Sequence, residues 1–274
     1  MTRSLEGRVI AITGASAGIG MACAERFARE GAAVALSARR GEKIAALAGQ
    51  LTASGARAIA VPGDVTHEAD VQALVDRAVE TFGRLDVMVA NAGAGYHGTL
   101  EDTPPDVARR LMDVNFIGTY LAARAAMRVF TRQGSGHLIV ISSIVGRRGV
   151  AGSALYGATK AAQLGFAESL RTEYLGTGID VTVVFPVATE TEFHSAMRRD
   201  YGVAVEGLGP KQSAETVAAA IHAAILKPRP EVYPHAKARA LAVLGVVAPG
   251  FTDKLVRKYA RRRKPAAQVP PGRA

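Results

Sequence analysis

The sequence has 274 residues, of which 49% are hydrophobic, 21% charged and 5% aromatic. This length suits one α/β domain or two small ones, and the composition predicts a globular protein with a mainly aliphatic core. The single cysteine, Cys23, excludes an internal disulfide and favours a reducing compartment. The N-terminal MTRSLEGR contains no apolar run, so we expect no signal peptide and a cytoplasmic location.

The net charge of +10 is concentrated at one end of the chain. Residues 251–274 hold eight Lys or Arg and one acid, Asp253, which leaves a net charge of only +3 for the other residues. The basicity therefore describes a tail and says little about the main domain. Nucleic-acid binding is not expected, because aromatic side chains do not interleave with these charges.

Short apolar runs alternate with helix-like segments along most of the chain. Strands are expected at 8–13, 33–37, 57–61, 85–90, 137–142 and 180–185, with a last short one near 231–233. Helices are expected at 21–30, 44–54, 69–82, 107–133 and 156–175. This alternation predicts βαβ units, and hence an α/β fold with a Rossmann-like, doubly wound parallel sheet covered by helices on both faces.

We expect a single domain over residues 1–234, with a substrate loop near 187–212, and a C-terminal extension over 235–274. Lys227–Pro230 interrupts the alternation, and the segment 236–248 is apolar. Thr252 is expected to cap a short basic helix that runs to Arg263. The final stretch, rich in Pro, Ala and Gly, is predicted to be disordered.

A glycine-rich stretch, Thr13–Gly20 (TGASAGIG), follows the first predicted strand and opens a helix. Glycines allow the backbone to approach a pyrophosphate, and a helix N-terminus offers free N–H groups and a positive dipole end. Gly14–Gly18 also fits G-x-S-x-G, the nucleophile elbow of α/β-hydrolases. We disfavour a hydrolase because that elbow normally follows several strands, whereas this one follows the first.

The end of the second strand indicates which dinucleotide is bound. NAD-binding proteins usually place an acid there, but this sequence continues Ser37-Ala38-Arg39-Arg40. Guanidinium groups hold a phosphate through forked, charge-assisted hydrogen bonds. We therefore expect NADP(H) rather than NAD(H), the alternative being a solvated basic turn.

Tyr156 and Lys160 form a Y-x-x-x-K pair, which lies on one face of the helix predicted at 156–175. A nearby ammonium favours the phenolate, and a phenol tuned toward neutral pH can exchange a proton with a carbonyl or alcohol oxygen. Such a pair is common on exposed helices, so its surroundings decide its meaning. Ser143 lies thirteen residues before Tyr156, just past a predicted strand.

Further motifs follow the same order. Asp64-Val65 comes after the third strand, Asn91-Ala92-Gly93 after the fourth, and Asn115 lies in the long helix. Together with the glycine-rich turn and the Ser143, Tyr156 and Lys160 set, these motifs closely resemble the short-chain dehydrogenase/reductase family. The resemblance runs from about Gly7 to Thr191.

The resemblance implies a role for each matching position. Ser143 would hold the substrate carbonyl, and Tyr156 would exchange its proton. Lys160 would bind the nicotinamide ribose and lower the pKa of Tyr156, and Asn115 would support a water relay. The residues implied to contact the cofactor are Gly14, Ser16, Ile19, Gly20, Arg39, Arg40, Asp64, Val65, Asn91, Gly93, Tyr156, Lys160, Val187 and Thr191. Substrate contacts are expected from Ser143, Tyr156, Tyr96, His97 and Phe193, and no metal site is expected.

The resemblance predicts an NADP(H)-dependent oxidoreductase that transfers hydride reversibly between NADPH and a small-molecule ketone or aldehyde. One alternative is a non-catalytic NADP(H)-binding or membrane-surface interaction protein, and a second is a 3-oxoacyl-thioester reductase. Glu231–Pro234 and the basic tail stand where many family members have a glycine-rich final strand, which weakens the second alternative. This departure also favours a homodimer over a tetramer, formed by the helices near 107–133 and 156–175.

The apolar run Ala240–Phe251 is too short to span a bilayer, which takes about 20 residues. Two interpretations stay open for it. The first, which we prefer, is a helix packed on its own domain. In the second, the run and the following Arg261–Lys264 lie on an anionic membrane surface, so that the protein is peripheral at a membrane.

Overall fold

The computed structural model describes residues 4–193, 195, 197 and 211–260. Within this part of the chain, one parallel sheet has the strand order β3-β2-β1-β4-β5-β6-β9. Its strands are β1 (Val9–Thr13), β2 (Ala33–Ser37), β3 (Ala58–Ala60), β4 (Val87–Ala90), β5 (Gly136–Ile141), β6 (Ile179–Val184) and β9 (Glu231–Val232). The predicted doubly wound parallel sheet is confirmed.

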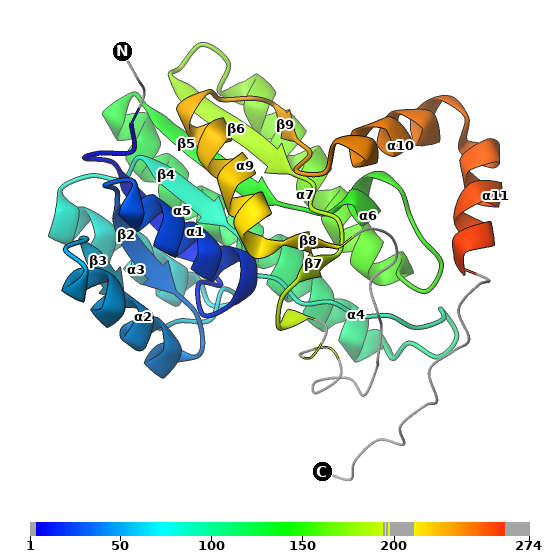
Figure 1. Ribbon diagram of the computed structural model, residues 1–274, viewed down its shortest axis with the longest axis horizontal. Helices are drawn as coiled ribbons and strands as arrows, with labels where there is room; N and C mark the ends of the chain where they lie inside the picture. The colour runs from blue at the N-terminus through cyan, green and yellow to red at the C-terminus, as the bar shows by residue number, and fades with distance from the viewer. Residues whose placement is uncertain (1–3, 194, 196, 198–210, 261–274) are drawn as a thin grey trace, which may run out of the picture.

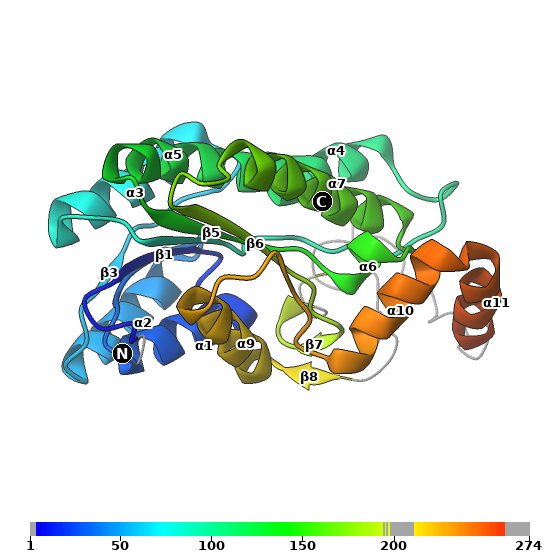
Figure 2. The same ribbon diagram turned by 90° about the horizontal axis from the view of Figure 1, so that it is seen from above.

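Helices cover both faces of this sheet (Figure 1). The helices on one face are α1 (Gly18–Arg29), α2 (Gly41–Ala53) and α9 (Ala214–Leu226), and those on the other are α3 (Glu68–Phe82), α4 (Pro105–Met112), α5 (Gly118–Gln133) and α7 (Ala154–Glu173). Figure 2 shows the two helical layers with the sheet between them. This three-layer arrangement buries the strands on both sides, as their continuous apolar sequences require.

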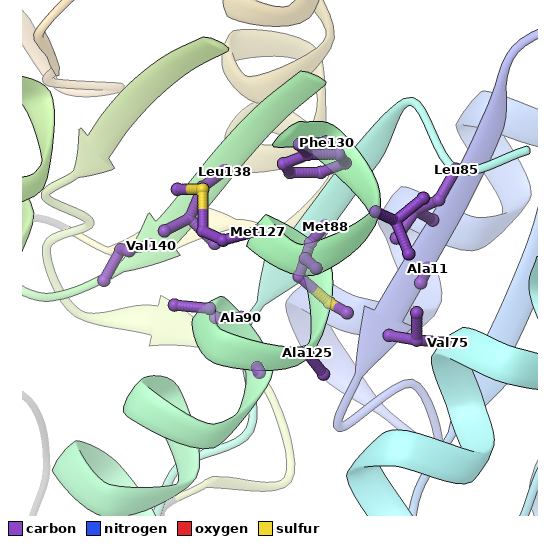
Figure 3. Close-up of a cluster of buried hydrophobic side chains, with 14 of the residues drawn as sticks. Ala11, Val75, Leu85, Met88, Ala90, Ala125, Met127, Phe130, Leu138 and Val140 are labelled. Carbon is purple, nitrogen blue, oxygen red and sulfur yellow. The ribbon is translucent and has the colours of Figure 1, made fainter. Parts of the chain in front are cut away.

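The core forms two clusters, one on each face of the sheet. Because successive side chains of a strand point to opposite faces, Val9 and Ala11 enter one cluster and Ile10 and Ile12 enter the other. Figure 3 shows the first cluster, where Met88 and Leu138 from the sheet and Phe130 from α5 meet. Cys23 is buried in the second cluster, on α1, as a small apolar side chain.

Several elements differ from those predicted. The long helix expected at 107–133 is interrupted by a π-helical turn, η1 (Asp113–Ile117), between α4 and α5. The sequence pattern did not predict α9, which packs beside α1 and is apolar on most of its surface. It also missed the one-turn helix α6 (Ile144–Arg147) and the short pair β7 (Thr189–Glu190) and β8 (Gln212–Ser213).

The C-terminal extension contains two helices, α10 (Ala236–Val247) and α11 (Pro249–Ala260). Thr252 was predicted to cap the second, but α11 begins three residues earlier and Thr252 is buried inside it. Its hydroxyl donates to the carbonyls of Ala248 and Pro249, as hydroxyls within a helix do. The rest of the helix predicted to reach Arg263, and the stretch expected to be disordered, lie outside the described residues. No described helix is long and apolar enough to cross a membrane.

A buried histidine, His137, joins β5 to β6. Its Nε2 lies 2.8 Å from the Thr182 hydroxyl, which itself donates to the Arg229 carbonyl at 2.6 Å. Nε2 must therefore donate, which fixes the neutral tautomer and leaves Nδ1 without a partner among the described residues. Burial is the main reason why the pKa of His137 falls from its ordinary value of 6.5 to about 3.

This histidine predicts a loss of stability in acid. Between pH 6.5 and about 3 the unfolded chain binds a proton at His137 that the folded protein does not. The free energy of unfolding should therefore fall as the pH falls through this window, by about 1.4 kcal/mol for each pH unit. Urea unfolding of wild type and His137→Gln at pH 7 and pH 4 measures it.

The His137→Gln variant should lose less stability than wild type between the two pH values. His67→Gln is the matched control, because the His67 side chain is 70% exposed. An acid-induced loss that is equal in wild type and His137→Gln would contradict the assignment.

Candidate active site

The site lies where β1 and β4 run side by side, at the carboxyl edge of the sheet. The chain leaves these two strands toward opposite faces, which opens the crevice where doubly wound sheets bind their ligands. Asn91, directly after β4, ties the two strand ends together. Its side-chain amide donates to the carbonyls of Thr13 at 2.9 Å and Gly14 at 3.2 Å, and its backbone N–H donates to the Thr13 hydroxyl.

The glycine-rich turn between β1 and α1 is shaped by two glycines. Gly14 has a φ of +68°, in the left-handed region that side chains disfavour. A Cβ at Gly20 would lie 2.4 Å from the Gly14 carbonyl oxygen, so only glycine fits there. Beneath the turn, Ile19 packs against the core.

The N-terminus of α1 faces this turn with no competing acceptor of its own. Its N-cap residue, Ala17, has no side chain that could accept from the first N–H groups, and no acid lies in the first turn. Unpaired N–H groups and a positive dipole end favour an anion. The turn therefore fits the pyrophosphate of a dinucleotide.

Basic residues surround the position expected for the adenosine end. Arg40, at the N-cap of α2, donates from Nε at 3.1 Å and from Nη2 at 2.9 Å to the Ser16 hydroxyl of the glycine-rich turn. Arg39 is exposed. Its charge acts on Asp64, whose pKa is below its ordinary value. Burial alone would raise this pKa, but the hydrogen bonds from Thr66 and the charge of Arg39 together outweigh burial.

Val65 follows Asp64 and lies against the first glycine of α5. A Cβ at Gly118 would be 2.8 Å from the Val65 side chain. The segment after β3 is thus packed on the start of α5, directly after η1. This contact places Asp64 and Val65 on the same side of the crevice as α5.

Tyr156, in the first turn of α7, meets Ser143, the N-cap residue of α6. Ser143 accepts from the Val145 N–H at 3.3 Å and hydrogen-bonds the Tyr156 hydroxyl. Withdrawal of this hydroxyl from water raises the pKa of Tyr156 to about 12, and the Ser143 hydrogen bond offsets only part of the rise. The phenol is therefore protonated at neutral pH.

Lys160 lies one turn further along α7 and is only 4% exposed. Its Nζ donates to the Ile141 carbonyl at 2.9 Å and sits 5.8 Å from the centre of the Tyr156 ring. Burial lowers the pKa of Lys160 to about 7. The sequence predicted that Lys160 lowers the pKa of Tyr156, whereas among the protein's own groups burial dominates and shifts both residues toward their neutral forms.

Asn115 is fully buried in the π-helical turn η1. Its side chain donates to the Ala94 carbonyl and the Thr159 hydroxyl, both at 2.9 Å, and accepts from the Ala94 N–H at 2.7 Å. The backbone carbonyl of Asn115 accepts from the Thr119 hydroxyl and from the Gln163 side-chain amide. Asn115 thus positions the segment after β4, and a π turn is a common device at functional sites.

Gly93 brings the backbone close to these groups. A Cβ there would lie 3.2 Å from the Asn115 side-chain oxygen and 3.5 Å from the Lys160 Nζ. A nicotinamide ribose needs donors and acceptors of this kind, so the residues fit the cofactor's central part. No group of metal-ligating side chains occurs among the described residues.

Three neighbours were not singled out from the sequence. Ser142 donates to the Lys160 carbonyl at 2.8 Å, which places Ser142 behind the site and Ser143 in front of it. Thr159 and Gln163 join Asn115 to α7. Their spacing from Tyr156, three and seven residues, is the helical signal that would have found them.

An aromatic side chain covers Tyr156. The Phe193 ring lies 5.9 Å from the Tyr156 ring and contacts Gly95, which also touches the Met197 sulfur. The predicted substrate residue Phe193 is therefore at the site. Of the substrate loop expected near 187–212, residues 194, 196 and 198–210 lie outside the described residues.

The remaining predicted residues lie around this centre. His97 contacts the Ser153 hydroxyl at 3.3 Å, just before α7, and burial lowers the pKa of His97. The Tyr96 ring lies against Gly98, and the Thr191 methyl lies against Gly18 of the glycine-rich turn. The Val187 carbonyl accepts from the Thr189 hydroxyl at 2.9 Å.

Comparison with known proteins gives the family. The family model described as short chain dehydrogenase matches residues 8–202. The chain belongs to this family. It is similar to the uncharacterized oxidoreductase YxnA of Bacillus subtilis, with 35% identity over 93% of this chain and 73% of YxnA. Dehydrogenase/reductase SDR family member 7B of Bos taurus is 34% identical over 96% of this chain and 85% of its own length.

Solved structures of family members have the same fold. A short-chain dehydrogenase/reductase from Burkholderia phymatum, in complex with NAD, matches with a TM-score of 0.81 and 25% identity over 97% of this chain and 99% of its own. A short-chain dehydrogenase from Burkholderia cenocepacia, in complex with NADP, matches with a TM-score of 0.73 and 32% identity over 83% and 96%. The chain is thus an oxidoreductase family member whose neighbours bind either nucleotide.

Proposed function

We propose that this short-chain dehydrogenase transfers hydride reversibly between NADP(H) and a small ketone or aldehyde, with Tyr156 as the general acid and base. The observation that carries this proposal is the arrangement of Ser143, Tyr156 and the buried Lys160 one turn away, with a glycine-rich crevice beside them. A pure binding protein has no need of a phenol and a serine aimed at the same point.

In the proposed reaction, the nicotinamide supplies or accepts the hydride. Ser143 and Tyr156 donate hydrogen bonds to the substrate carbonyl oxygen, which fixes the carbonyl and polarises it. As the oxygen gains negative charge, Tyr156 gives it the phenolic proton. In the oxidation direction, the deprotonated Tyr156 takes the alcohol proton.

The protonation state of Tyr156 favours reduction. With a pKa of about 12, the phenol holds its proton at neutral pH, which is the form that a carbonyl reduction consumes. Oxidation needs the phenolate, which the neighbouring Lys160 stabilises only in its charged form. We therefore propose that the protein without its cofactor holds Tyr156 in the form that donates a proton to a carbonyl oxygen.

The substrate side of the site is apolar. Phe193 lies beside Tyr156 and, with Met197, packs against Gly95, and burial lowers the pKa of His97, which favours its neutral form. This lining supports an apolar ketone or aldehyde as substrate. A 3-oxoacyl thioester remains the alternative within the enzymes, and the C-terminal extension still weighs against it.

Replacing the phenol is the direct test. Tyr156→Phe should lower kcat by at least about 100-fold, because a positioned general acid contributes that much or more. NADPH binding, measured by the fluorescence of the bound nucleotide, should change little. Tyr174→Phe, at the C-cap of the same helix, is the matched control and should keep full activity.

A non-catalytic protein would respond differently. If wild type turned over no member of a broad ketone and aldehyde panel, or if Tyr156→Phe retained wild-type turnover, the proposed mechanism would be refuted. Retained NADPH binding with no turnover in wild type would favour the alternative of a nucleotide-binding protein.

We base the proposed preference for NADP(H) on the two arginines that follow β2. Arg39 is exposed beside Asp64, and Arg40 faces the glycine-rich turn, so both can reach a 2′-phosphate. Arg39→Asp should raise the Kd for NADPH by at least about 10-fold and leave that for NADH within about two-fold, since only NADPH carries the phosphate. Arg77→Asp, on the exposed face of α3, is the control. Equal effects of Arg39→Asp on both nucleotides would remove Arg39 from the phosphate site.

We also propose a homodimer formed through α5 and α7. A surface groove between these helices is lined by Tyr120, Met127, Phe166 and Leu170, with Arg124 and Arg128 at its edges. Tyr120 is 40% exposed in this groove although it is large and aromatic. Apolar side chains on two long neighbouring helices suit self-association about a two-fold axis.

The cytoplasmic location stays a prediction from the sequence.

The helices α10 and α11 carry a further proposal, contact with an anionic membrane surface. α10 packs against α6 and buries only Ala238 and Ala242, while Val243, Val246 and Val247, which share one of its faces, are 57–78% exposed. In α11, Phe251 is 62% exposed and Lys254 and Arg257 follow it. Exposed apolar side chains beside basic ones suit the interface of an anionic bilayer.

Vesicle sedimentation tests this contact. Wild type should bind phosphatidylserine-containing vesicles better than phosphatidylcholine vesicles, and less at high salt. Val246→Ser with Val247→Ser should lower the partition coefficient at least about ten-fold, because each buried valine contributes on the order of 1 kcal/mol. Leu175→Ser, which removes an 81% exposed apolar side chain elsewhere, is the control.

Two results would refute the membrane contact. The first is equal vesicle binding by the double variant and wild type. The second is that wild type does not bind vesicles and the double variant has a different molecular mass in solution from wild type. A second copy of the chain would then be the occupant of this surface.

A further inference from the structure

A single carboxylate links the two ends of the crevice. Glu192 forms ion pairs with Arg40, at 2.7 Å from Nη1 to Oε2, and with Lys43, at 3.1 Å from Nζ to Oε1. Glu192 follows Thr191, whereas both partners belong to the start of α2. The acid and its two cations are about 150 residues apart in the sequence, so only the fold brings them together.

Both cations belong to the expected 2′-phosphate region. Arg40 already donates two hydrogen bonds to the Ser16 hydroxyl, and its remaining Nη1 is directed to Glu192. Lys43 lies in the first turn of α2, three residues further along the same face. A carboxylate and a phosphate accept from the same donors, with similar geometry.

We propose that Glu192 is a specificity-determining residue: it occupies Arg40 and Lys43 in place of the 2′-phosphate, so that NADP(H) must displace it whereas NAD(H) need not. This inference rests on the proposed preference for NADP(H). It adds Lys43 as a phosphate contact and Glu192 as the group that limits the preference.

The strength of these ion pairs sets the size of the effect. The side chains of Glu192, Arg40 and Lys43 are 51%, 39% and 50% exposed, so water screens both pairs. Exposed pairs of this kind are weak, so a doubly charged phosphate can overcome them. Hydrogen bonds from Arg40 and Lys43 hold the pKa of Glu192 below its ordinary value, so the competing carboxylate is ionised at neutral pH.

The same short segment reaches the catalytic tyrosine. The Thr191 side chain lies against Gly18 of the pyrophosphate turn, and its hydroxyl accepts from the Phe193 N–H at 3.2 Å. The Phe193 ring then covers Tyr156. Displacement of Glu192 by a 2′-phosphate therefore acts on a segment that touches both the cofactor turn and the substrate side.

Two small nucleotides separate the phosphate contact from the rest of the cofactor. Adenosine 2′,5′-bisphosphate carries the 2′-phosphate, and adenosine 5′-monophosphate does not. Calorimetric titration of the full chain at low salt gives their Kd values for wild type, Glu192→Gln and Glu42→Gln. Glu42 is the matched control, since it is an exposed acid in the first turn of α2, next to Lys43.

Glu192→Gln should bind the bisphosphate about five-fold more tightly than wild type, since two exposed ion pairs no longer compete. Its Kd for the monophosphate should stay within about two-fold of the wild-type value, which also shows that the variant is folded. Raising the salt concentration should shrink the gain, because these charges are exposed. Glu42→Gln should show less than half of the gain.

The outcomes separate this inference from the cofactor proposal. If wild type prefers the bisphosphate and Glu192→Gln does not increase that preference, or if Glu42→Gln gains equally, the competition is refuted and NADP(H) binding stands. If neither wild type nor Glu192→Gln prefers the bisphosphate, both proposals fail. If only Glu192→Gln prefers it, the competition is supported, and Glu192 is the reason why wild type does not discriminate.

Discussion

The site depends on one buried amine. The Lys160 side chain is almost entirely removed from water, and a lone ammonium in such a place is costly unless polar groups face it. The Ile141 carbonyl at the end of β5 accepts its hydrogen bond, and the Asn115 side-chain oxygen and the amine both lie close to Gly93. The sheet edge, the π turn and α7 must meet at this point, so the position of Lys160 fixes the position of Tyr156.

The neutral bias of Tyr156 and Lys160 follows from the same burial. The protein's own surroundings shift both groups toward uncharged forms, the phenol to a pKa of about 12 and the amine to about 7. Hydroxyls of a bound ribose would give the amine further polar neighbours, and a charged Lys160 would in turn favour the phenolate. The residues thus form a site whose proton affinity responds to the cofactor, while the protein keeps its apolar surroundings dry.

Local patterns made much of this site predictable. The glycine-rich turn and the Tyr156 and Lys160 pair depend on neighbours within one turn of helix, so their sequence spacing carries their geometry. Ser143 could be chosen over Ser142 by its spacing from Tyr156, and the structure places it at the phenol. The sheet was predictable for a similar reason, since each buried strand is a short apolar run bounded by turns.

Other features depend on contacts that no local pattern records. The π turn at Asn115 lies between two helical segments, so the sequence pattern of this region predicts one long helix. α9 escaped prediction because it is rich in alanine and has few polar side chains to mark its helical period. The contact of Glu192 with Arg40 joins exposed polar residues from distant segments, a kind of pair that is common on surfaces and has no sequence signature.

The one-turn helix α6 connects the chemistry to the C-terminal extension. Its N-cap is Ser143, and at its other end Arg147 pairs with Glu231 of β9 and lies over the Phe185 ring. The next residue, Arg148, pairs with Asp253 of α11 and lies against Gly245 of α10. A single turn of helix therefore joins α10 and α11 to Ser143, the residue that we propose holds the substrate carbonyl. Since a small displacement of a positioning group is costly in catalysis, we expect changes in the extension to affect turnover through α6.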